Sequence, residues 1–366
     1  MNRFASPGHL RMVVVALAAL VLPIVAVDLV VGEGASGAGR GPDAVGSALQ
    51  EPAVASPSAA PAGYHRGPRC WTRPGARWCR PATAATPPAS AAPDPAASTP
   101  APSYRPGAFP NPASTGVPAG WQPASVHEGD LFVYDAGTVI EDMMITGDLQ
   151  IRAADVTVRR TRVKGIIWNQ YDDNEQFGGL LIEDTEVGPD SGVKDWGHGA
   201  VGTAGYTARR VEIHNVTDGF RVSGDNVLIE DSFVKLAVIP GECNHLDGVQ
   251  GYGGGRNVVI RHSTLDARGS CGNSAVFFAD SSPNADVQDN VLLGGAYSLR
   301  LNQFEIPATF VAKNNHIVDG SYDDGPVYIV DNGALTLTCS GNQVVTIDSN
   351  YQVTGVVGDA PCNRGR

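Results

Sequence analysis

Three stretches of this chain read Asp155-Val-Thr-Val-Arg-Arg-Thr-Arg-Val163, Asn226-Val-Leu-Ile-Glu-Asp-Ser-Phe-Val234 and Asn257-Val-Val-Ile-Arg-His-Ser-Thr-Leu265. In each, apolar and polar residues alternate and then reach a small polar residue at a fixed place. Alternation with a period of two predicts a β-strand, and the small polar residue predicts a turn that tolerates a left-handed backbone. Weaker copies of the pattern follow at 180–187, 285–292, 310–317 and 337–344.

The turns recur at positions 232, 263, 290, 315 and 342, which lie 31, 27, 25 and 27 residues apart. A second set of strands lies between them, at Gly219-Phe-Arg-Val222, Gly248-Val-Gln-Gly251, Ala275-Val-Phe-Phe278, Ser298-Leu-Arg-Leu301 and Val327-Tyr-Ile-Val330. Two interleaved sets on one period mean that each repeat is a coil of at least two strands, stacked in parallel about 4.8 Å apart. We therefore predict an all-β fold, a right-handed parallel β-helix (β-solenoid) over residues 109–366. The alternative, a β-sandwich, does not require one residue type once per coil.

Residues 1–31 have the layout of an export signal. Two arginines precede the run 12–31, which is apolar except for Pro23 and Asp28. A basic stretch followed by an apolar one is typical of a secretory signal peptide, and this run is also about long enough to span a membrane. A cleaved signal peptide or a retained N-terminal membrane anchor would each place the rest of the chain outside the cytoplasm, secreted or at the cell surface.

Residues 32–108 are rich in Ala, Pro, Ser and Gly and contain few large apolar side chains. Such a segment cannot bury enough surface to offset its chain entropy, so we expect a disordered linker. Within it, Cys70 and Cys79 flank a Pro-Gly pair, which predicts a small disulfide loop around a turn.

Charge is distributed unevenly between the linker and the repeats. Before residue 109, nine arginines and five acids give a net charge of +4, and because the whole chain carries −12, residues 109–366 carry −16. A domain this acidic argues against nucleic acid as a partner, since phosphate binding needs a basic face.

The chain has six cysteines, an even number, which favours disulfides in an exported protein. Cys243 and Cys271 lie 28 residues apart, and each just precedes a strand of the second set. Stacked coils would bring these two cysteines within bonding reach. Cys339 and Cys362 lie 23 residues apart, where a bond would pin the C-terminal tail over the last coil. We expect both disulfides.

Four segments read Phe109-Pro-Asn-Pro-Ala-Ser-Thr-Gly-Val-Pro-Ala-Gly120, Tyr206-Thr-Ala-Arg-Arg-Val-Glu-Ile213, His245-Leu-Asp-Gly-Val-Gln250 and Asn257-Val-Val-Ile-Arg-His262. They resemble a group of exported actinobacterial proteins with right-handed β-helix domains, similar to the pectate-lyase-like superfamily. The resemblance covers roughly residues 109–362 and implies the fold. It is less specific for activity, because this fold carries lyases, hydrolases, epimerases and non-catalytic adhesins.

In a solenoid, the outward side chains of one set of strands form a strip that loops can turn into a groove. Aligning the second set gives one outward column of Arg221, Gln250, Phe277, Arg300 and Tyr328. The next column contains Tyr252 and Asn302. Arginine forks, amides and aromatic faces suit a sugar chain and its carboxylates, so we predict that these seven residues bind substrate. An ordinary solvated sheet face is the alternative.

A second group of candidates lies at the start of the same strands. Asp218 would stack on Asp247 one coil later, and two adjacent carboxylates either take up a proton or hold a cation such as Ca²⁺. His245 lies two residues before Asp247, so in an extended chain both would point the same way. We therefore predict Asp218, His245, Asp247 and Arg300 as catalytic residues, with His245 a simpler base than Arg300. The alternative is that Asp-Gly is turn chemistry used twice.

The resemblance and these residues together favour an exported polysaccharide-active enzyme, a monomer that acts as a pectate-lyase-like polysaccharide lyase on a uronate or cell-wall glycan. A glycoside hydrolase would need two carboxylates at the proper spacing, which Asp218 and Asp247 on adjacent coils could supply. A non-catalytic, surface-displayed glycan-binding or structural solenoid is the alternative from another class.

Overall fold

The computed structural model describes residues 70–73, 76–79, 108–172, 175–195, 197, 199–243, 245–252, 255–269, 271–278, 284–303, 308–331 and 333–365. The segment 1–31 and nearly all of the linker lie outside these residues. Strands and turns make up the described part, and no helix within it is long and apolar enough to cross a membrane.

The chain divides into two compact units, residues 1–96 and 97–366. In the first, β1 (Cys70–Arg73) pairs with antiparallel β2 (Ala76–Cys79), and Cys70 lies opposite Cys79. The side chains of this hairpin lie outside the described atoms, so the predicted Cys70–Cys79 bond stays a prediction.

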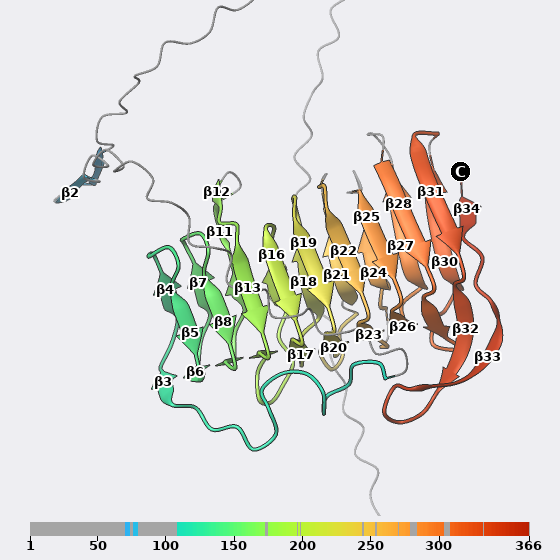
Figure 1. Ribbon diagram of the computed structural model, residues 1–366, viewed down its shortest axis with the longest axis horizontal. Helices are drawn as coiled ribbons and strands as arrows, with labels where there is room; N and C mark the ends of the chain where they lie inside the picture. Colours follow the sequence, from blue (N-terminus) through green and yellow to red (C-terminus); the bar gives the residue numbers. More distant parts are fainter. Residues whose placement is uncertain are drawn as a thin grey trace, which may run out of the picture. The chain divides into compact units, whose positions relative to one another are not determined.

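The second unit is a stack of coils whose strands form three sheets (Figure 1). The ten-stranded sheet contains β4 (Leu131–Val133), β7 (Leu149–Ile151), β10 (Ile167–Trp168), β15 (Val201–Gly202), β18 (Asp218–Val222), β21 (Asp247–Gly251), β24 (Ser274–Phe278), β27 (Tyr297–Gln303), β30 (Gly325–Asp331) and β34 (Asn363–Gly365). The nine-stranded sheet contains β5 (Val139–Glu141), β8 (Thr157–Arg159), β13 (Leu180–Glu183), β16 (Tyr206–Arg209), β19 (Val227–Glu230), β22 (Val258–Arg261), β25 (Ala285–Gln288), β28 (Ala308–Lys313) and β31 (Leu335–Ser340).

The eleven-stranded sheet completes each coil. It contains β3 (Ser125–His127), β6 (Met143–Ile145), β9 (Arg162–Val163), β14 (Glu186–Val187), β17 (Glu212–His214), β20 (Phe233–Lys235), β23 (Thr264–Ala267), β26 (Val291–Gly294), β29 (His316–Val318), β32 (Gln343–Ile347) and β33 (Val353–Asp359). A separate antiparallel hairpin, β11 (Gln170–Asp172) with β12 (Glu175–Gln176), projects from an early coil.

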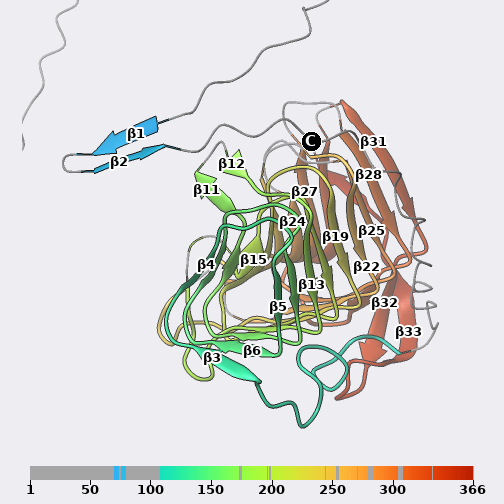
Figure 2. The same ribbon diagram turned by 60° about the vertical axis from the view of Figure 1, so that its left-hand side comes forward.

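Each coil passes through the three sheets in the same order, as β17, β18 and β19 do, and then begins again with β20. Strands of successive coils pair in parallel throughout these sheets, except that β33 folds back antiparallel to β32. Figure 2 shows the three sheets wrapped around one interior. The predicted β-solenoid of stacked parallel strands is therefore confirmed, with three strands in a full coil.

Inward side chains stack in columns and exclude water from the interior. One column in the ten-stranded sheet consists of Ile167, Val201, Phe220, Val249 and Val276, none of which has exposed surface. Burying each of these side chains is worth about 1.5 to 3 kcal/mol. The interior thus depends on every coil placing an apolar residue at the same point of its path.

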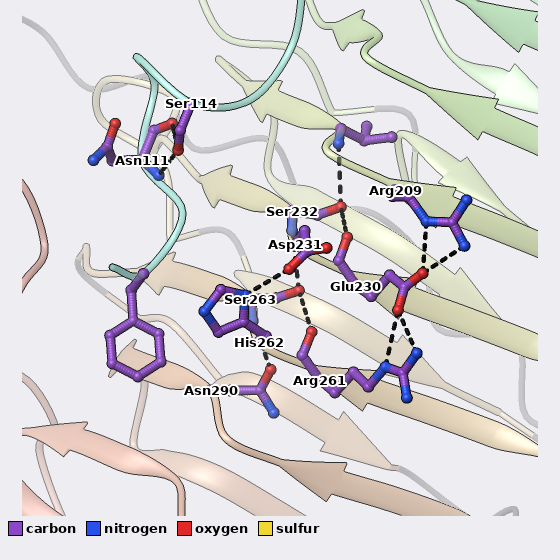
Figure 3. A network of polar contacts seen from close by, with 12 residues as sticks. Asn111, Ser114, Arg209, Glu230, Asp231, Ser232, Arg261, His262, Ser263 and Asn290 are labelled. Atoms are coloured by element: carbon purple, nitrogen blue, oxygen red, sulfur yellow. Dashed lines mark hydrogen bonds and ion pairs between the residues drawn. The ribbon is translucent and has the colours of Figure 1, made fainter. Parts of the chain in front are cut away.

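The predicted turn column is a ladder of buried polar side chains between the nine- and eleven-stranded sheets (Figure 3). The Oγ of Ser232 accepts the backbone N–H of Val211, and the Oγ of Ser263 accepts that of Ser232. Asn290, Asn315 and Asn342 continue the column, and each accepts the N–H of the residue one coil before. The preceding residue of each turn adopts a positive φ, from 44° at His262 to 68° at Gly341. That geometry explains the small polar pairs in the repeat.

Two disulfide bonds tie a loop and the C-terminal tail to the coils. Cys243 and Cys271 are bonded with their Cα atoms 5.4 Å apart, and Cys339 and Cys362 with theirs 6.2 Å apart. Both predicted bonds are confirmed, and disulfides of this kind form in oxidising compartments. Beyond the second bond, β34 joins the ten-stranded sheet beside β30.

The outer face of the nine-stranded sheet is occupied by a ladder of ion pairs. Arg209 lies between Glu183 and Glu230, with N···O distances of 2.6 Å to each. Arg261 binds the other oxygen of Glu230 at 2.5 Å, and Figure 3 shows Glu230 held between the two arginines. Acids and arginines alternate from coil to coil along this column, so each charge is neutralised by its neighbours within the sheet.

The outer face of the eleven-stranded sheet is covered by both ends of the solenoid unit. Residues 109–121, the N-terminal strap, cross it from the last coils toward the first (Figure 2). The side chain of Gln352 accepts the N–H of Phe109 at 2.8 Å and donates to its carbonyl at 2.9 Å. The Phe109 ring lies 5.5 Å from that of His262 and 5.2 Å from that of His316.

The strap continues to the first coils and shares its face with the C-terminal hairpin. Gly116 donates its N–H to the carbonyl of Arg210, and the indole of Trp121 donates to Asp142 at 3.3 Å. Tyr351 packs edge-on against Phe233 in a second apolar cluster that is separate from the solenoid interior. This face is therefore closed by the chain itself.

The asparagine ladder makes a direct prediction for stability. Asn315→Ala removes the side-chain bonds to Val287, Asn290 and Asn342 from a buried site. Because buried partners lose their hydrogen bonds, the free energy of unfolding should fall by about 2 to 4 kcal/mol in chemical denaturation. The exposed Asn350→Ala is the control and should change it by less than about 0.5 kcal/mol. Equal effects of the two substitutions would mean that the ladder does not hold the coils together.

Candidate functional site

One outward column runs along the ten-stranded sheet. Backbone register places Arg221, Gln250, Phe277, Arg300 and Tyr328 opposite one another on β18, β21, β24, β27 and β30. All five side chains are half-buried. The column predicted from the sequence is therefore confirmed in its register, because each coil repeats the same alternation of inward and outward residues.

The column extends beyond the predicted residues in both directions. Toward the first coil it continues through Gly202, Trp168, Gln150 and Phe132. Toward the last it ends at Asn363 on β34. Sequence alignment missed Trp168 because its strand, β10, has only two residues and no recognisable copy of the repeat. Its only sequence signal was a tryptophan followed by a polar turn.

Gly202 leaves space in the column because it has no side chain. A Cβ at Gly202 would lie 2.7 Å from the Cβ of Arg221 and 3.0 Å from the indole of Trp168. Such contacts are closer than side chains tolerate, so glycine is needed on the coil between Trp168 and Arg221 for these two side chains to lie where they do. Substitution here would displace one of the two side chains.

Aromatic rings and guanidinium groups pack against one another across the column. The Arg221 guanidinium lies 4.2 Å from the centre of the Tyr252 ring, and that of Arg300 lies 5.0 Å from the Phe277 ring. Tyr297 and Tyr328 stack with their centroids 4.7 Å apart. Cation–π contacts of this kind hold an arginine in place through the face of its guanidinium group. Some of the N–H groups are already engaged, because Arg221 donates from Nε to Oγ of Ser223 at 3.0 Å and from Nη1 to Oε1 of Gln250.

The second predicted column is present in part. Tyr252 follows β21 and is 40% exposed. Asn302 lies opposite Val330 and accepts a hydrogen bond from Nε of Arg300 at 3.3 Å. The Asn302 amide thus orients Arg300 as well as facing outward.

The two predicted acids do stack. Asp218 lies opposite Asp247 in register, and the N–H of Asp247 donates to Oδ1 of Asp218 at 3.2 Å. Asp247 has no exposed surface, whereas Asp218 is half-buried. Oδ2 of Asp247 accepts from the amides of Gln250 at 3.1 Å and Asn273 at 3.2 Å. Its Oδ1 is buried without a hydrogen-bond partner among the described residues.

This environment favours a proton on the pair. Burial raises the pKa of Asp247 to about 8, and repulsion by Asp218 contributes in the same direction. Burial also raises the pKa of Asp218, to about 6. The adjacent Arg221 is desolvated too, which lowers its pKa from the ordinary arginine value. Burial thus disfavours two charges at this position and favours the neutral form of Asp247.

Calcium fits this environment poorly. The part of the chain that the structure describes has no group of three or more His, Cys, Asp or Glu side chains that could hold a metal ion. Two amide N–H groups already point at Oδ2 of Asp247, and their positive ends would face a cation. Of the two outcomes expected for Asp218 and Asp247, the burial of Asp247 favours uptake of a proton by one acid, and we derive no step through Ca²⁺.

The other two predicted catalytic residues lie apart from this pair. The expectation that His245 points the same way as Asp247 is wrong, because β21 begins only at Asp247 and strand alternation does not reach back to His245. His245 is exposed, while Asp247 is fully buried. Arg300 lies three strands along the sheet from Arg221, about 14 Å at 4.8 Å per step. Arg221 is the arginine beside the acids.

The raised pKa of Asp247 makes stability depend on pH. An unfolded carboxyl ionises near pH 3.9, so between about pH 4 and about pH 8 the folded chain binds more protons than the unfolded chain. The free energy of unfolding should therefore fall as pH rises through this window. Asp247→Asn cannot ionise at this position. The free energy of unfolding that it loses between about pH 5 and about pH 8 should be smaller, by about 4 kcal/mol, than the loss of the unmodified chain in urea titrations.

Asp225→Asn is the matched control for this pH dependence. Hydrogen bonds from Arg256 lower the pKa of Asp225, so its titration is complete below this window. The free energy of unfolding of Asp225→Asn should therefore depend on pH in the same way as that of the unmodified chain. An Asp247→Asn profile that also follows the unmodified chain would show that Asp247 is ionised in the fold.

Comparison with known proteins adds no relative to these observations. No protein-family model matches the chain, and no curated protein or solved structure matches it. The chemistry of this face therefore has to be argued from its own side chains.

Proposed function

We propose that this protein is an exported, right-handed parallel β-helix that binds an extended, carboxylate-bearing polysaccharide along the outer face of its ten-stranded sheet. The observation that carries the proposal is the continuous column from Trp168 to Tyr328. Every coil of this column except that of Gly202 presents an aromatic face, an amide or an arginine, and successive coils lie about 4.8 Å apart. A linear polymer can follow such a column over many coils.

The other two faces support this choice because their own side chains or segments occupy them. Ion pairs between neighbouring coils engage the charged column of the nine-stranded sheet from Glu141 to Arg261. The strap and the C-terminal hairpin cover the eleven-stranded sheet. The ten-stranded sheet alone presents half-buried rings and arginines that are anchored by packing within the described chain.

The charges on this face favour an acidic glycan. Arg221 and Arg300 are the cations of the column, in a domain whose net charge from the sequence is strongly negative. A guanidinium fork recognises a carboxylate by two parallel hydrogen bonds, and a half-buried site strengthens them. The surrounding negative charge would exclude uronate polymers from other parts of the surface.

We also propose that the protein is exported and that its coils wind right-handed. Two disulfides fit an oxidising compartment, and the apolar run at 12–31 supplies a route out of the cytoplasm. Parallel strands joined by crossovers wind right-handed in nearly all proteins. The resemblance to pectate-lyase-like proteins points to the same compartment and winding.

A second candidate function is β-elimination by a polysaccharide lyase. The observation that favours it is the stacking of Asp218 on buried Asp247, where burial raises both carboxyl pKa values, together with Arg221, whose pKa burial lowers. In that reaction a base removes the proton next to the uronate carboxyl, the C–O bond to the leaving sugar breaks, and an acid protonates the departing oxygen. In this scheme Arg221 would act as the base and half-buried Asp218 as the acid, whereas fully buried Asp247 would tune Asp218. Hydrolysis by the same acids is the remaining enzymatic alternative.

Calorimetric titration of the full chain with polygalacturonate, alginate and hyaluronan tests the proposal, with neutral dextran as a control polymer. We expect Arg221→Ala and Trp168→Ala each to weaken binding of an acidic polymer about tenfold or more, since each removes an anchor of the column. Lys313→Ala on the nine-stranded sheet is the matched charge control and should bind like the unmodified chain. Unfolding curves of all variants check that the fold is kept.

Several outcomes would contradict the proposal. Binding of none of the acidic polymers, or equal loss in Lys313→Ala and Arg221→Ala, would remove this face as the binding site. The same mixtures also separate the two functions. Ultraviolet absorbance from a conjugated product would establish β-elimination, new reducing ends without that absorbance would establish hydrolysis, and binding without either would leave a non-catalytic solenoid.

A further inference from the structure

The first coil carries a pair of exposed aromatic side chains on the same sheet as the candidate site. Phe132 is 48% exposed and Tyr134 is 70% exposed. Their rings lie nearly parallel, at 10° to each other, with centroids 6.4 Å apart. Large rings left this open to water are costly unless they serve an interface or a ligand, so the pair calls for a partner.

These rings continue the outward column of the proposed site. Phe132 lies opposite Gln150, which in turn lies opposite Trp168. Arg152 donates to Oε1 of Gln150 at 2.7 Å and fixes the amide between the two aromatic positions. Four coil steps separate Phe132 from Arg221, about 19 Å at 4.8 Å per step. A chain that follows the column past Trp168 therefore reaches Phe132 and Tyr134 next.

The charged side chains near Phe132 and Tyr134 favour some binding partners over others. Glu128, Asp130 and Asp135 are all exposed on the same coil. A second copy docked through this end by a two-fold axis would bring the same acids face to face, which disfavours self-association. Arg152 on the next coil opposes these charges in part, but its guanidinium already donates to Gln150 and to the Ile151 carbonyl. Three acids outnumber this cation, so a uronate carboxylate is disfavoured here. An uncharged sugar ring, stacking its C–H face on an aromatic ring, meets neither penalty.

We propose that Phe132 and Tyr134 form a distal stacking subsite for uncharged sugar units of the same glycan whose carboxylates bind at Arg221 and Arg300. This inference rests on the proposed function and adds a substrate class to it. The ligand is a long, linear polysaccharide in which uncharged stretches accompany acidic ones. Chains too short to span from Arg221 to Phe132 would not sense the subsite.

The test uses the full chain and two forms of one polymer, partly methyl-esterified and fully de-esterified polygalacturonate, with short oligogalacturonates as a third probe. We expect the unmodified chain to bind the partly esterified polymer about tenfold more tightly than the de-esterified one. Phe132→Ala/Tyr134→Ala should lose that difference and leave binding of the short oligomers unchanged. Because both side chains are exposed, the urea midpoint of unfolding should stay unchanged.

Val356→Ala/Val357→Ala removes an exposed apolar pair from β33 and is the matched control. It should keep the preference for the esterified polymer. An unmodified chain that binds both polymers equally, or a preference that survives in Phe132→Ala/Tyr134→Ala, would overturn the subsite while leaving the Arg221 site standing. A chain that binds no form would overturn the proposed function itself. Sedimentation showing a dimer that Phe132→Ala/Tyr134→Ala dissociates would assign the rings to self-association instead.

Discussion

Hydrogen bonding between parallel strands of successive coils is the constraint on which the rest of this structure depends. Each coil must return to the same register about 4.8 Å from the last, so a residue at one point of the path always stacks on its counterpart. The ladder from Ser232 to Asn342 enforces that return at one corner, because each buried side chain accepts the backbone N–H of the coil before it. Once the register is fixed, a single residue choice per coil becomes a column along the molecule.

Columns of this kind explain why the three faces differ so strongly. On the nine-stranded sheet, alternating acids and arginines neutralise one another, as Glu230 does between Arg209 and Arg261. On the eleven-stranded sheet, the strap anchored at Phe109 closes the surface. The ten-stranded sheet instead combines rings and guanidinium groups with the stacked acids Asp218 and Asp247, and the low dielectric around Asp247 both favours its neutral form and strengthens nearby hydrogen bonds. We therefore propose this sheet as the site that recognises an acidic glycan.

The sequence predicted the features that recur in every coil and missed those that occur once. The column from Arg221 to Tyr328 and the stacking of Asp218 on Asp247 followed from aligning similar coils, and the register confirms both. The third sheet was not foreseen because many of its strands, such as β14 (Glu186–Val187), are too short to show periodicity. His245 was misplaced because alternation was extended beyond the start of β21. Trp168, Asn273 and the strap depend on contacts between segments distant in sequence, which no local pattern reports.

Hydroxyl-radical footprinting of the full chain, with and without polygalacturonate, tests the placement of the glycan most directly because it reads the exposure of individual side chains. The account predicts that Trp168, Tyr252, Phe277 and Tyr328 lose reactivity when the polymer binds, while half-buried Tyr322, which lies outside the column, keeps it. Protection confined to residues outside the ten-stranded sheet, or no protection at saturating polymer, would contradict it.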